Sequence, residues 1–167
     1  MVEPVNSIAE VFPPPRIRVI SLALIRRPST GGWLAVRGED ARKGEVFYRP
    51  AGGGVEFGER SQDAACREMM EEFGALVQPV RLLGTTENIF TYLGNPGHEI
   101  VFLWECRFVD EGFYALDEIV IADDDGNRAP AHWIDPDDLA ARGIALYPDG
   151  LPELLRQKKA DSQKFPF

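Results

Sequence analysis

Hydrophobic residues in this chain come in short runs separated by glycine, proline and charged residues, which is typical of strands joined by tight turns. Residues 16–25 (RIRVISLALI) are almost continuously apolar after the first arginines, so we expect a largely buried strand. Two β-rich runs, 77–93 and 98–109, flank the sequence GNPG at 94–97 and predict a long hairpin that turns there. Further strands are expected at 32–38, 46–50, 113–122 and 129–134.

The clearest helix is expected over residues 61–73 (SQDAACREMMEEF), where apolar positions recur at helical spacing. Ser61 is its expected N-cap, Asp63 lies in the first turn, where the helix dipole favours an acid, and Gly74 is expected to end it. Shorter helices are expected after the Asp-Pro pair at 135–136 and from about 151 to 159. This order of elements predicts an α/β fold, with helices packed on the faces of a mixed sheet.

The length of 167 residues suits one domain with a substantial core. Residues 1–15 end in three consecutive prolines and are expected to form an extended N-terminal arm. We therefore assign residues 16–160 to a single domain and residues 161–167 to a C-terminal tail.

Composition narrows the classes of function. With 27 acidic and 18 basic side chains, the formal charge is −9. Nucleic acid and membrane surfaces are not expected as partners, because binding either directly requires a basic face.

Cys66 and Cys106 provide no disulfide framework and are expected to be core residues of a cytoplasmic protein. No stretch approaches 18 continuous apolar residues, so membrane insertion is not expected.

Acidic residues are concentrated in two segments. Residues 110–125 carry seven acids scattered among hydrophobic residues, which a solvated hairpin edge explains. Residues 53–75 carry six, and Glu68, Glu71 and Glu72 share one side of the expected helix. Carboxylates at these spacings repel one another unless a cation compensates. Mg²⁺ or Mn²⁺ is the expected cation, because both prefer oxygen ligands. For three glutamates considered alone, the alternative is an acidic helix face exposed to solvent.

The segment before this helix favours the cation site over the solvated face. Residues 51–59 (AGGGVEFGE) are expected to form a loop in which four glycines permit close approach by a ligand or metal. Arg67 lies within the acidic cluster and can pair with Glu71 one turn later or with Glu59 from the loop. Such a pair would fix the loop to the helix.

Residues 53–75 also match the signature of the Nudix family, G-x5-E-x7-R-E-U-x-E-E-x-G-U, in which U is a bulky aliphatic residue. The charged and glycine positions are all present, and the departures are Met69 and Ala75 at two aliphatic positions. The chain resembles a Nudix domain from about residue 16 to 159. The resemblance implies an α/β/α sandwich with a mixed β-sheet between helices. It also implies that the protein uses metal-activated water to hydrolyse a nucleoside diphosphate linked to another group.

The resemblance further assigns roles to residues of this segment. Glu71 and Glu72 would be the principal ligands of Mg²⁺ or Mn²⁺, and Glu68 would be a ligand or the base that activates water. Glu59 and Arg67 would form an orienting ion pair. A carbonyl of Gly52 or Gly53 would add a metal ligand.

Residues beyond the signature are expected to complete the site. Glu99 is the favoured extra catalytic carboxylate or ligand and Glu87 the second choice, with hairpin-end pairing as the alternative for both. Arg18 and Arg49 are candidates for contacts with the phosphates or base of the substrate; the alternative is that both are ordinary exposed arginines of strands. Phe90 and Tyr92 are candidates for stacking on a base; the alternative is that both are core residues. Phe57 is a further candidate for stacking, and His98 for binding phosphate or positioning water, with a structural hydrogen bond as its alternative. Glu111 and the acids at 117–118 are lower-ranked candidates for the extra carboxylate.

The expected substrate is a small-molecule nucleotide or nucleotide derivative. A tyrosine 17 residues beyond the signature resembles diadenosine polyphosphate hydrolases, and Tyr92 stands there. The neighbouring proline that resembles the ADP-ribose group is missing. The alternative to an enzyme is a Nudix-like binding or regulatory module without turnover, but the retained Glu59, Arg67 and three helix glutamates favour catalysis. A homodimer is a reasonable expectation.

Overall fold

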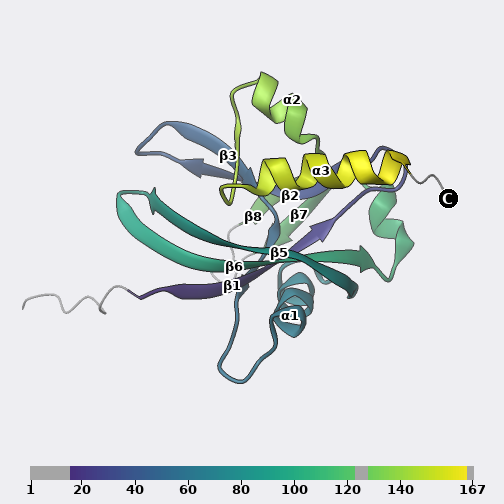
Figure 1. Ribbon diagram of the computed structural model, residues 1–167, viewed down its shortest axis with the longest axis horizontal. Coiled ribbons are helices and arrows are strands. Elements are labelled where there is room, and N and C mark those ends of the chain that lie inside the picture. The colour runs from purple at the N-terminus through teal and green to yellow at the C-terminus, as the bar shows by residue number, and fades with distance from the viewer. Residues whose placement is uncertain (1–15, 123–127, 165–167) are drawn as a thin grey trace, which may run out of the picture.

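The computed structural model describes residues 16–122 and 128–164 and has the expected mixed α/β fold (Figure 1). The predicted arm 1–15, the acids at 123–125 and part of the predicted tail, 165–167, lie outside the described residues. The strands are β1 (Arg18–Ile25), β2 (Trp33–Asp40), β3 (Glu45–Arg49), β4 (Ala51–Gly54), β5 (Val77–Tyr92), β6 (Asn95–Phe108), β7 (Glu118–Ala122), β8 (Arg128–Ile134) and β9 (Ala145–Leu146). The helices are α1 (Ser61–Phe73), the 3-10 helix η1 (Glu111–Ala115), α2 (Pro136–Ala141) and α3 (Leu151–Lys164).

The strands form two mixed sheets. The first has the order β4-β1-β6-β5, with β1 parallel to β6 and the other neighbours antiparallel. The second has the order β7-β8-β2-β3-β9 and contains one parallel pair, β3 with β9. Figure 1 shows α1 on one side of the strands and α2 and α3 on the other. The predicted arrangement of strands between helices is therefore confirmed, with the strands divided between two sheets.

The near-continuous apolar run of β1 reflects burial on both faces. Ala23 and Ile25 belong to a core that includes Ala65 and Met69 of α1. Alternate β1 residues, such as Leu22, join a second core that includes side chains of α2 and α3. Strand β2 also divides its side chains between these cores. Strands β1 and β2 thus contribute to both cores, and α1 packs on the first.

Helix α1 has the predicted bounds, but its start differs from the prediction. Arg60, not Ser61, is the N-cap, and no side chain caps the helix there. The Ser61 carbonyl accepts a hydrogen bond from Ser21 (2.6 Å), and its hydroxyl accepts one from the Trp104 indole (3.1 Å). These contacts with β1 and β6 explain why Ser61 does not cap its own helix. Gly74 ends the helix as predicted, in the left-handed conformation.

The long β5–β6 hairpin is confirmed, but its turn lies earlier than predicted. Strand β6 begins at Asn95, so Leu93 and Gly94 form the turn in place of residues 94–97. Both turn residues have positive φ, 50° and 81°, as a two-residue hairpin turn of the favoured twist requires. Leucine is unusual in this conformation, and its N–H donates to the Asp40 carboxylate at 3.0 Å. A contact from another hairpin therefore sets this turn.

Other segments also depart from the sequence expectations. Residues 51–54 form β4 rather than a loop, because glycines there can approach β1 closely. Residues 111–115 form η1, so the strand expected from 113 begins at 118. Strand β7 is an edge of the second sheet, which agrees with the expected solvated edge. Helix α3 extends past 159 to 164.

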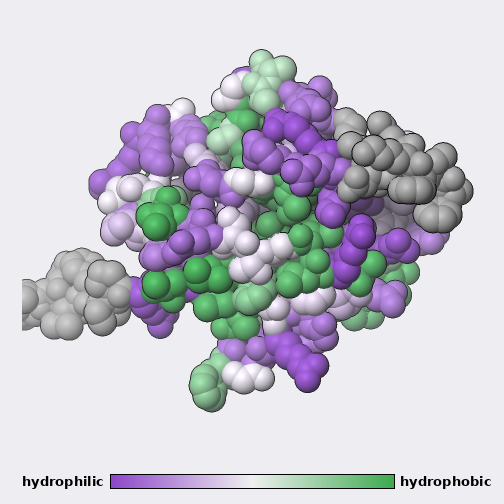
Figure 2. All heavy atoms as spheres, viewed as in Figure 1, coloured by the Kyte–Doolittle hydropathy of each residue, from purple (hydrophilic) through white to green (hydrophobic). Residues whose placement is uncertain are grey.

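The two cysteines agree with the expectation that both are core residues. Cys106 is buried, and Cys66 packs against the first core. Burial raises the pKa of both thiols, that of Cys106 to about 12. Within the described residues, no helix is long and apolar enough to cross a membrane. Figure 2 shows hydrophobic side chains across the middle of one face. Exposed apolar residues on β1 and β5 include Val19, Leu82 and Ile89. The expected homodimer stays a prediction.

Candidate active site

Arg67 is the central residue of the acidic segment. Its guanidinium donates two hydrogen bonds to Glu59, at 2.9 and 3.0 Å, which is the bidentate geometry that suits arginine and a carboxylate. It also donates to Glu68 (2.8 Å), Glu71 (3.0 Å) and the Gly54 carbonyl (2.8 Å). Both partners that the sequence suggested for Arg67 are therefore used at once. Arg67 ties the loop, β4 and α1 together.

These contacts shift the ionisation of the pair. The Arg67 hydrogen bonds, followed by the backbone N–H of Glu56, lower the pKa of Glu59 below its ordinary value. The hydrogen bond to Glu59 is the main cause of the raised pKa of Arg67. Both groups are therefore charged at neutral pH.

Glu68 lies directly against the glycine strand. A Cβ placed on Gly53 would lie 2.5 Å from the Glu68 carboxyl carbon, so only glycine leaves room for this carboxylate. Gly52 is equally constrained for another reason. Its φ is 139°, and a Cβ there would lie 2.1 Å from the Ser21 carbonyl oxygen of β1. Gly53 thus allows the Glu68 carboxylate of α1 to pack against β4, and Gly52 allows β4 to approach the backbone of β1.

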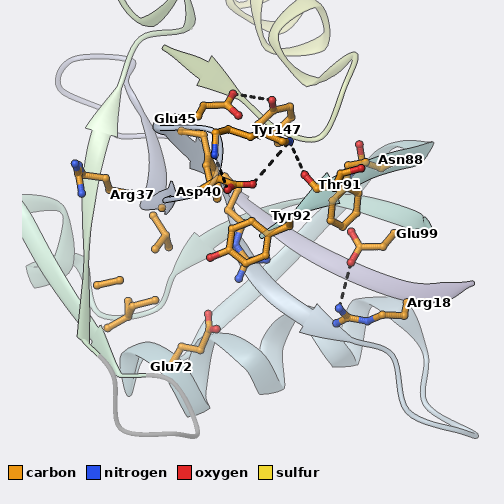
Figure 3. A pocket seen from close by; sticks show the side chains of 18 residues that line it. Arg18, Arg37, Asp40, Glu45, Glu72, Asn88, Thr91, Tyr92, Glu99 and Tyr147 are labelled. Atoms are coloured by element: carbon orange, nitrogen blue, oxygen red, sulfur yellow. Dashed lines mark hydrogen bonds and ion pairs between the residues drawn. The ribbon is translucent and has the colours of Figure 1, made fainter. Parts of the chain in front are cut away.

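Two cavities adjoin α1. A smaller one, of about 410 Å³, is lined by Glu68, Glu71, Arg67 and residues 54–56. A larger one, of about 430 Å³, lies between the two sheets and has Glu72 in its wall. In Figure 3, Glu72 projects from α1 toward this cavity, with Tyr92 between it and the strands beyond. The three helix carboxylates, predicted to lie on one side of the helix, are thus divided between two adjoining spaces.

The larger cavity has aromatic walls on both sheets. The Phe47 ring of β3 lies across Gly38 of β2, where an added Cβ would lie 2.5 Å from the ring. The Phe90 ring of β5 lies in the same way across Gly97 of β6, where an added Cβ would lie 2.4 Å from the ring. Tyr92 packs edge-on against Phe47, with ring centroids 6.1 Å apart. Glycines in the partner strands therefore let two rings line the cavity.

Asp40 joins two hairpins at the rim of this cavity. Its carboxylate accepts backbone N–H bonds from Leu93, Arg42 and Lys43 at 3.0 to 3.1 Å. Burial alone would raise the pKa of Asp40, but these three donors and the Lys43 ammonium lower it below its ordinary value. The Tyr92 hydroxyl adds a bond to the Glu39 carbonyl at 3.3 Å. The β2–β3 and β5–β6 hairpins are thus connected through side chains.

A row of polar side chains crosses the first sheet at the other side of the cavity. Arg18 of β1, Glu99 of β6 and Asn88 of β5 are register neighbours. Arg18 pairs with Glu99 at 3.3 Å, and Glu99 is only 8% exposed. Figure 3 shows this pair with Asn88 nearby on the strands. Glu99, predicted as an extra catalytic carboxylate, therefore shares a cavity with Glu72 and not with Glu68.

The remaining sequence candidates fall into two groups. Arg49, Phe90 and Tyr92, like Arg18, line the larger cavity. The others do not line either cavity. Glu87 pairs with His98 at 2.8 Å, as the hairpin-end alternative described, and Asp117 pairs with Arg27 at 3.2 Å. Phe57 is fully exposed and Glu111 begins η1.

Comparison with known proteins identifies the family. The model of the NUDIX domain matches residues 15–154, which is most of the chain. The chain belongs to the Nudix family. This membership makes it a hydrolase that acts on phosphorus-containing anhydrides, as the sequence signature implied.

Solved structures of Nudix proteins have the same fold. A Nudix hydrolase from Nitrosomonas europaea has 21% identity and a TM-score of 0.55, covering 91% of this chain and 94% of its own. A MutT protein from Methanosarcina mazei has 18% identity and a TM-score of 0.57, covering 90% and 98%. A MutT Nudix hydrolase from Burkholderia pseudomallei has 26% identity and a TM-score of 0.51, covering 73% and 85%.

Nudix proteins generally use a divalent metal, and the donor chemistry of this site fits one. Glu68, Glu71 and Glu72 offer hard carboxylate oxygens, and the space at Gly53 admits the Glu68 carboxylate close to β4. Across the described ranges 16–122 and 128–164, no three acidic, histidine or cysteine residues form a ready-made metal cluster. Arg67 instead holds Glu68 and Glu71 through hydrogen bonds. A bound cation would thus compete with this guanidinium for the same oxygens.

The signature did not identify several residues that line the larger cavity. Asp40, Phe47, Asn88 and Tyr147 all line the larger cavity. Each comes from a segment whose pattern indicated only strand or connection. The glycines opposite the two phenylalanines were the available signal, because a glycine within a strand often marks a close approach by another group.

Proposed function

We propose that this Nudix domain is a Mg²⁺- or Mn²⁺-dependent pyrophosphohydrolase that cleaves a nucleoside diphosphate linked to another group. The observation that supports this most is the larger cavity, in which Glu72 of the signature faces a space with aromatic and basic walls. Its volume lies within the range of roughly 300–1,000 Å³ typical of small-molecule sites. A phosphate end near α1 and a base end between the aromatic rings would fit this division.

We assign the signature residues the roles that the family resemblance implies for them. We propose Glu71 and Glu72 as principal metal ligands, with Glu68 as a further ligand or as the base that removes a proton from water. A carbonyl of Gly52 or Gly53 is the proposed backbone ligand. When bound, the cation would neutralise phosphate charge and lower the pKa of a coordinated water. Arg67 holds Glu68 in position, and Glu59 in turn holds Arg67.

Residues of the larger cavity are proposed to bind the substrate. Arg49 and Arg18 supply positive charge for phosphate oxygens, although Arg18 is shared with Glu99. Phe90 and Tyr92 offer ring surfaces to a base. Glu99 is the second candidate for the general base, because it lies in the same cavity as Glu72.

A substrate screen tests this function. Nucleoside triphosphates, dinucleoside polyphosphates, nucleotide sugars and ADP-ribose are incubated with the purified chain and Mg²⁺, and products are resolved by chromatography. We expect at least one compound to be cut at a phosphoanhydride bond, EDTA to stop the reaction, and Mg²⁺ or Mn²⁺ to restore it. Glu68→Gln should lower kcat by about 10²-fold or more, in the range of a lost general base.

Asp63→Asn is the matched control, because Asp63 is an exposed acid on the same helix outside both cavities. It should turn over at the wild-type rate. Full activity of Glu68→Gln, or full activity in EDTA, would contradict the proposed mechanism. Tight binding of a nucleotide with no cleavage of any compound would favour a regulatory module instead.

A further inference from the structure

Asn88 is a buried polar side chain that the protein leaves partly unsatisfied. The residue is 8% exposed, and its Oδ1 atom is buried without a hydrogen-bond partner in the described structure. It is the one side-chain oxygen or nitrogen in this condition among the described residues. Buried polar groups are normally paired, since an unpaired one destabilises the fold. An unpaired group kept in a cavity wall points to a ligand.

The position of Asn88 explains why no protein group satisfies it. The residue lies in the middle of β5, away from any turn or helix end that its amide could cap. Its register neighbour Glu99 pairs with Arg18. Two residues further along β5, Phe90 contributes its ring to the same cavity wall. In Figure 3, Asn88 lies on the strand that also carries Thr91 and Tyr92 into the cavity.

We propose that Asn88 determines substrate specificity by accepting a hydrogen bond from an exocyclic amino group of the nucleobase. This inference rests on the proposed function, because it deepens the assignment of the larger cavity. The rings of Phe47, Phe90 and Tyr92 suit a flat base, and a base bound among them would bring its edge to the strand that carries Asn88. An acceptor at that edge favours a base with an amino group there over the analogue that has hydrogen or a carbonyl at the same position.

Matched pairs of nucleotides that differ by one amino group test this inference. The pairs are GTP with ITP, ATP with purine riboside triphosphate, and CTP with the triphosphate of pyrimidin-2-one riboside, which lacks the 4-amino group. Wild-type kcat/KM should favour the amino-bearing member of at least one pair by about tenfold or more, because an unpaired site group penalises the analogue that lacks the donor. Asn88→Leu should bring that ratio close to one. Asn88→Asp, which keeps the acceptor, should retain it.

Asn95→Leu is the matched control, because Asn95 is an exposed asparagine at the tip of the same hairpin outside the cavity lining. Its ratio should equal that of the wild type. Thermal unfolding provides a second readout. Asn88→Leu should unfold at the same or a higher temperature, because it removes an unpaired polar group. A marked loss of stability would assign Asn88 a structural role and overturn the inference.

Binding separates this inference from the proposed function. Calorimetry with the matching nucleoside monophosphates in EDTA measures base recognition without turnover. Discrimination in wild type that disappears in Asn88→Leu would support the inference even if no compound is cleaved. Cleavage without discrimination in wild type, or discrimination that survives in Asn88→Leu, would overturn the inference and leave the proposed function intact. Absence of nucleotide binding, together with no cleavage of any compound in the presence of Mg²⁺, would overturn both.

Discussion

Replacing Arg67 with methionine should remove the connection between the glycine strand, the loop and α1. The change deletes five hydrogen bonds, two of them to Glu59, and leaves the carboxylates of Glu59 and Glu68 close together without their cation. The Glu71 contact adds little, because that side chain is 48% exposed. Stability and activity should both fall.

The expected magnitude follows from burial. Removing one partner of a fully buried pair costs about 3–5 kcal/mol, whereas an exposed pair contributes about 0–1 kcal/mol. The side chains of Arg67 and Glu59 are 26% and 17% exposed, so we expect a loss of about 2–3 kcal/mol between these limits. At about 2–4 °C per kcal/mol for a domain of this size, Tm should fall by roughly 5–10 °C.

Calorimetry or circular dichroism measures this shift, and a double-mutant cycle isolates the pair. Arg67→Met with Glu59→Gln should cost less than the two single changes together, by about 1–2 kcal/mol. Arg67→Lys should give an intermediate Tm, because lysine keeps the charge but loses the bidentate geometry. Additive effects, or a Tm for Arg67→Met within about 2 °C of wild type, would refute this account of the network.

The same pair predicts a pH dependence. Arg67 lowers the pKa of Glu59 from its ordinary value of 4.5, so the stabilisation is fully present above that value. It is lost as the pH falls through the lower value in the folded protein. Without Arg67, the acid limb of the Tm–pH profile should therefore become shallower. An unchanged slope in Arg67→Met would contradict the assigned cause.

Three further predictions concern the larger cavity and the metal. Gly97→Ala should displace the Phe90 ring and raise KM more than it changes kcat in steady-state kinetics; an unchanged KM would exclude this ring from substrate binding. The lowered pKa of Asp40 predicts stabilisation that is complete above its ordinary value of 3.8 and declines as pH falls through the folded value. Asp40→Asn should therefore flatten the Tm–pH profile in acid, and equal slopes in both proteins would contradict this. Removal of divalent metal by EDTA should stop turnover without unfolding the protein, because both cores consist of hydrophobic residues and do not include the proposed glutamate ligands. A cooperative loss of circular dichroism in EDTA would assign the metal a structural role.

Local sequence patterns were sufficient for most of the elements and for the acidic segment. The helix at 61–73 and the pairing of Arg67 with Glu59 follow from spacings of a few residues. Ser61 shows where local rules fail. Its propensity to cap a helix was overridden by hydrogen bonds from Ser21 and Trp104, which are distant in sequence. The predicted position of the hairpin turn was wrong for a similar reason, because Asp40 stabilises Leu93 in a conformation that leucine seldom adopts.

The larger cavity was the least predictable part of the site. Its walls come from both sheets, and no single segment contains the pattern. Arg18, Arg49, Phe90 and Tyr92 were identified because strands near the signature carry them. Asn88 was missed, since an asparagine within a strand is unremarkable until its burial and missing partner are known.

The dependence of the initial rate on Mg²⁺ concentration, compared between wild type and Glu72→Gln, tests the central claim most directly. Glu72 belongs to the family signature and also lines the proposed substrate cavity. With the substrate that the screen identifies, the wild-type rate should rise and saturate with Mg²⁺. Glu72→Gln should need more Mg²⁺ and saturate at a rate about 10²-fold lower. A wild-type Mg²⁺ profile and rate in Glu72→Gln would contradict the account.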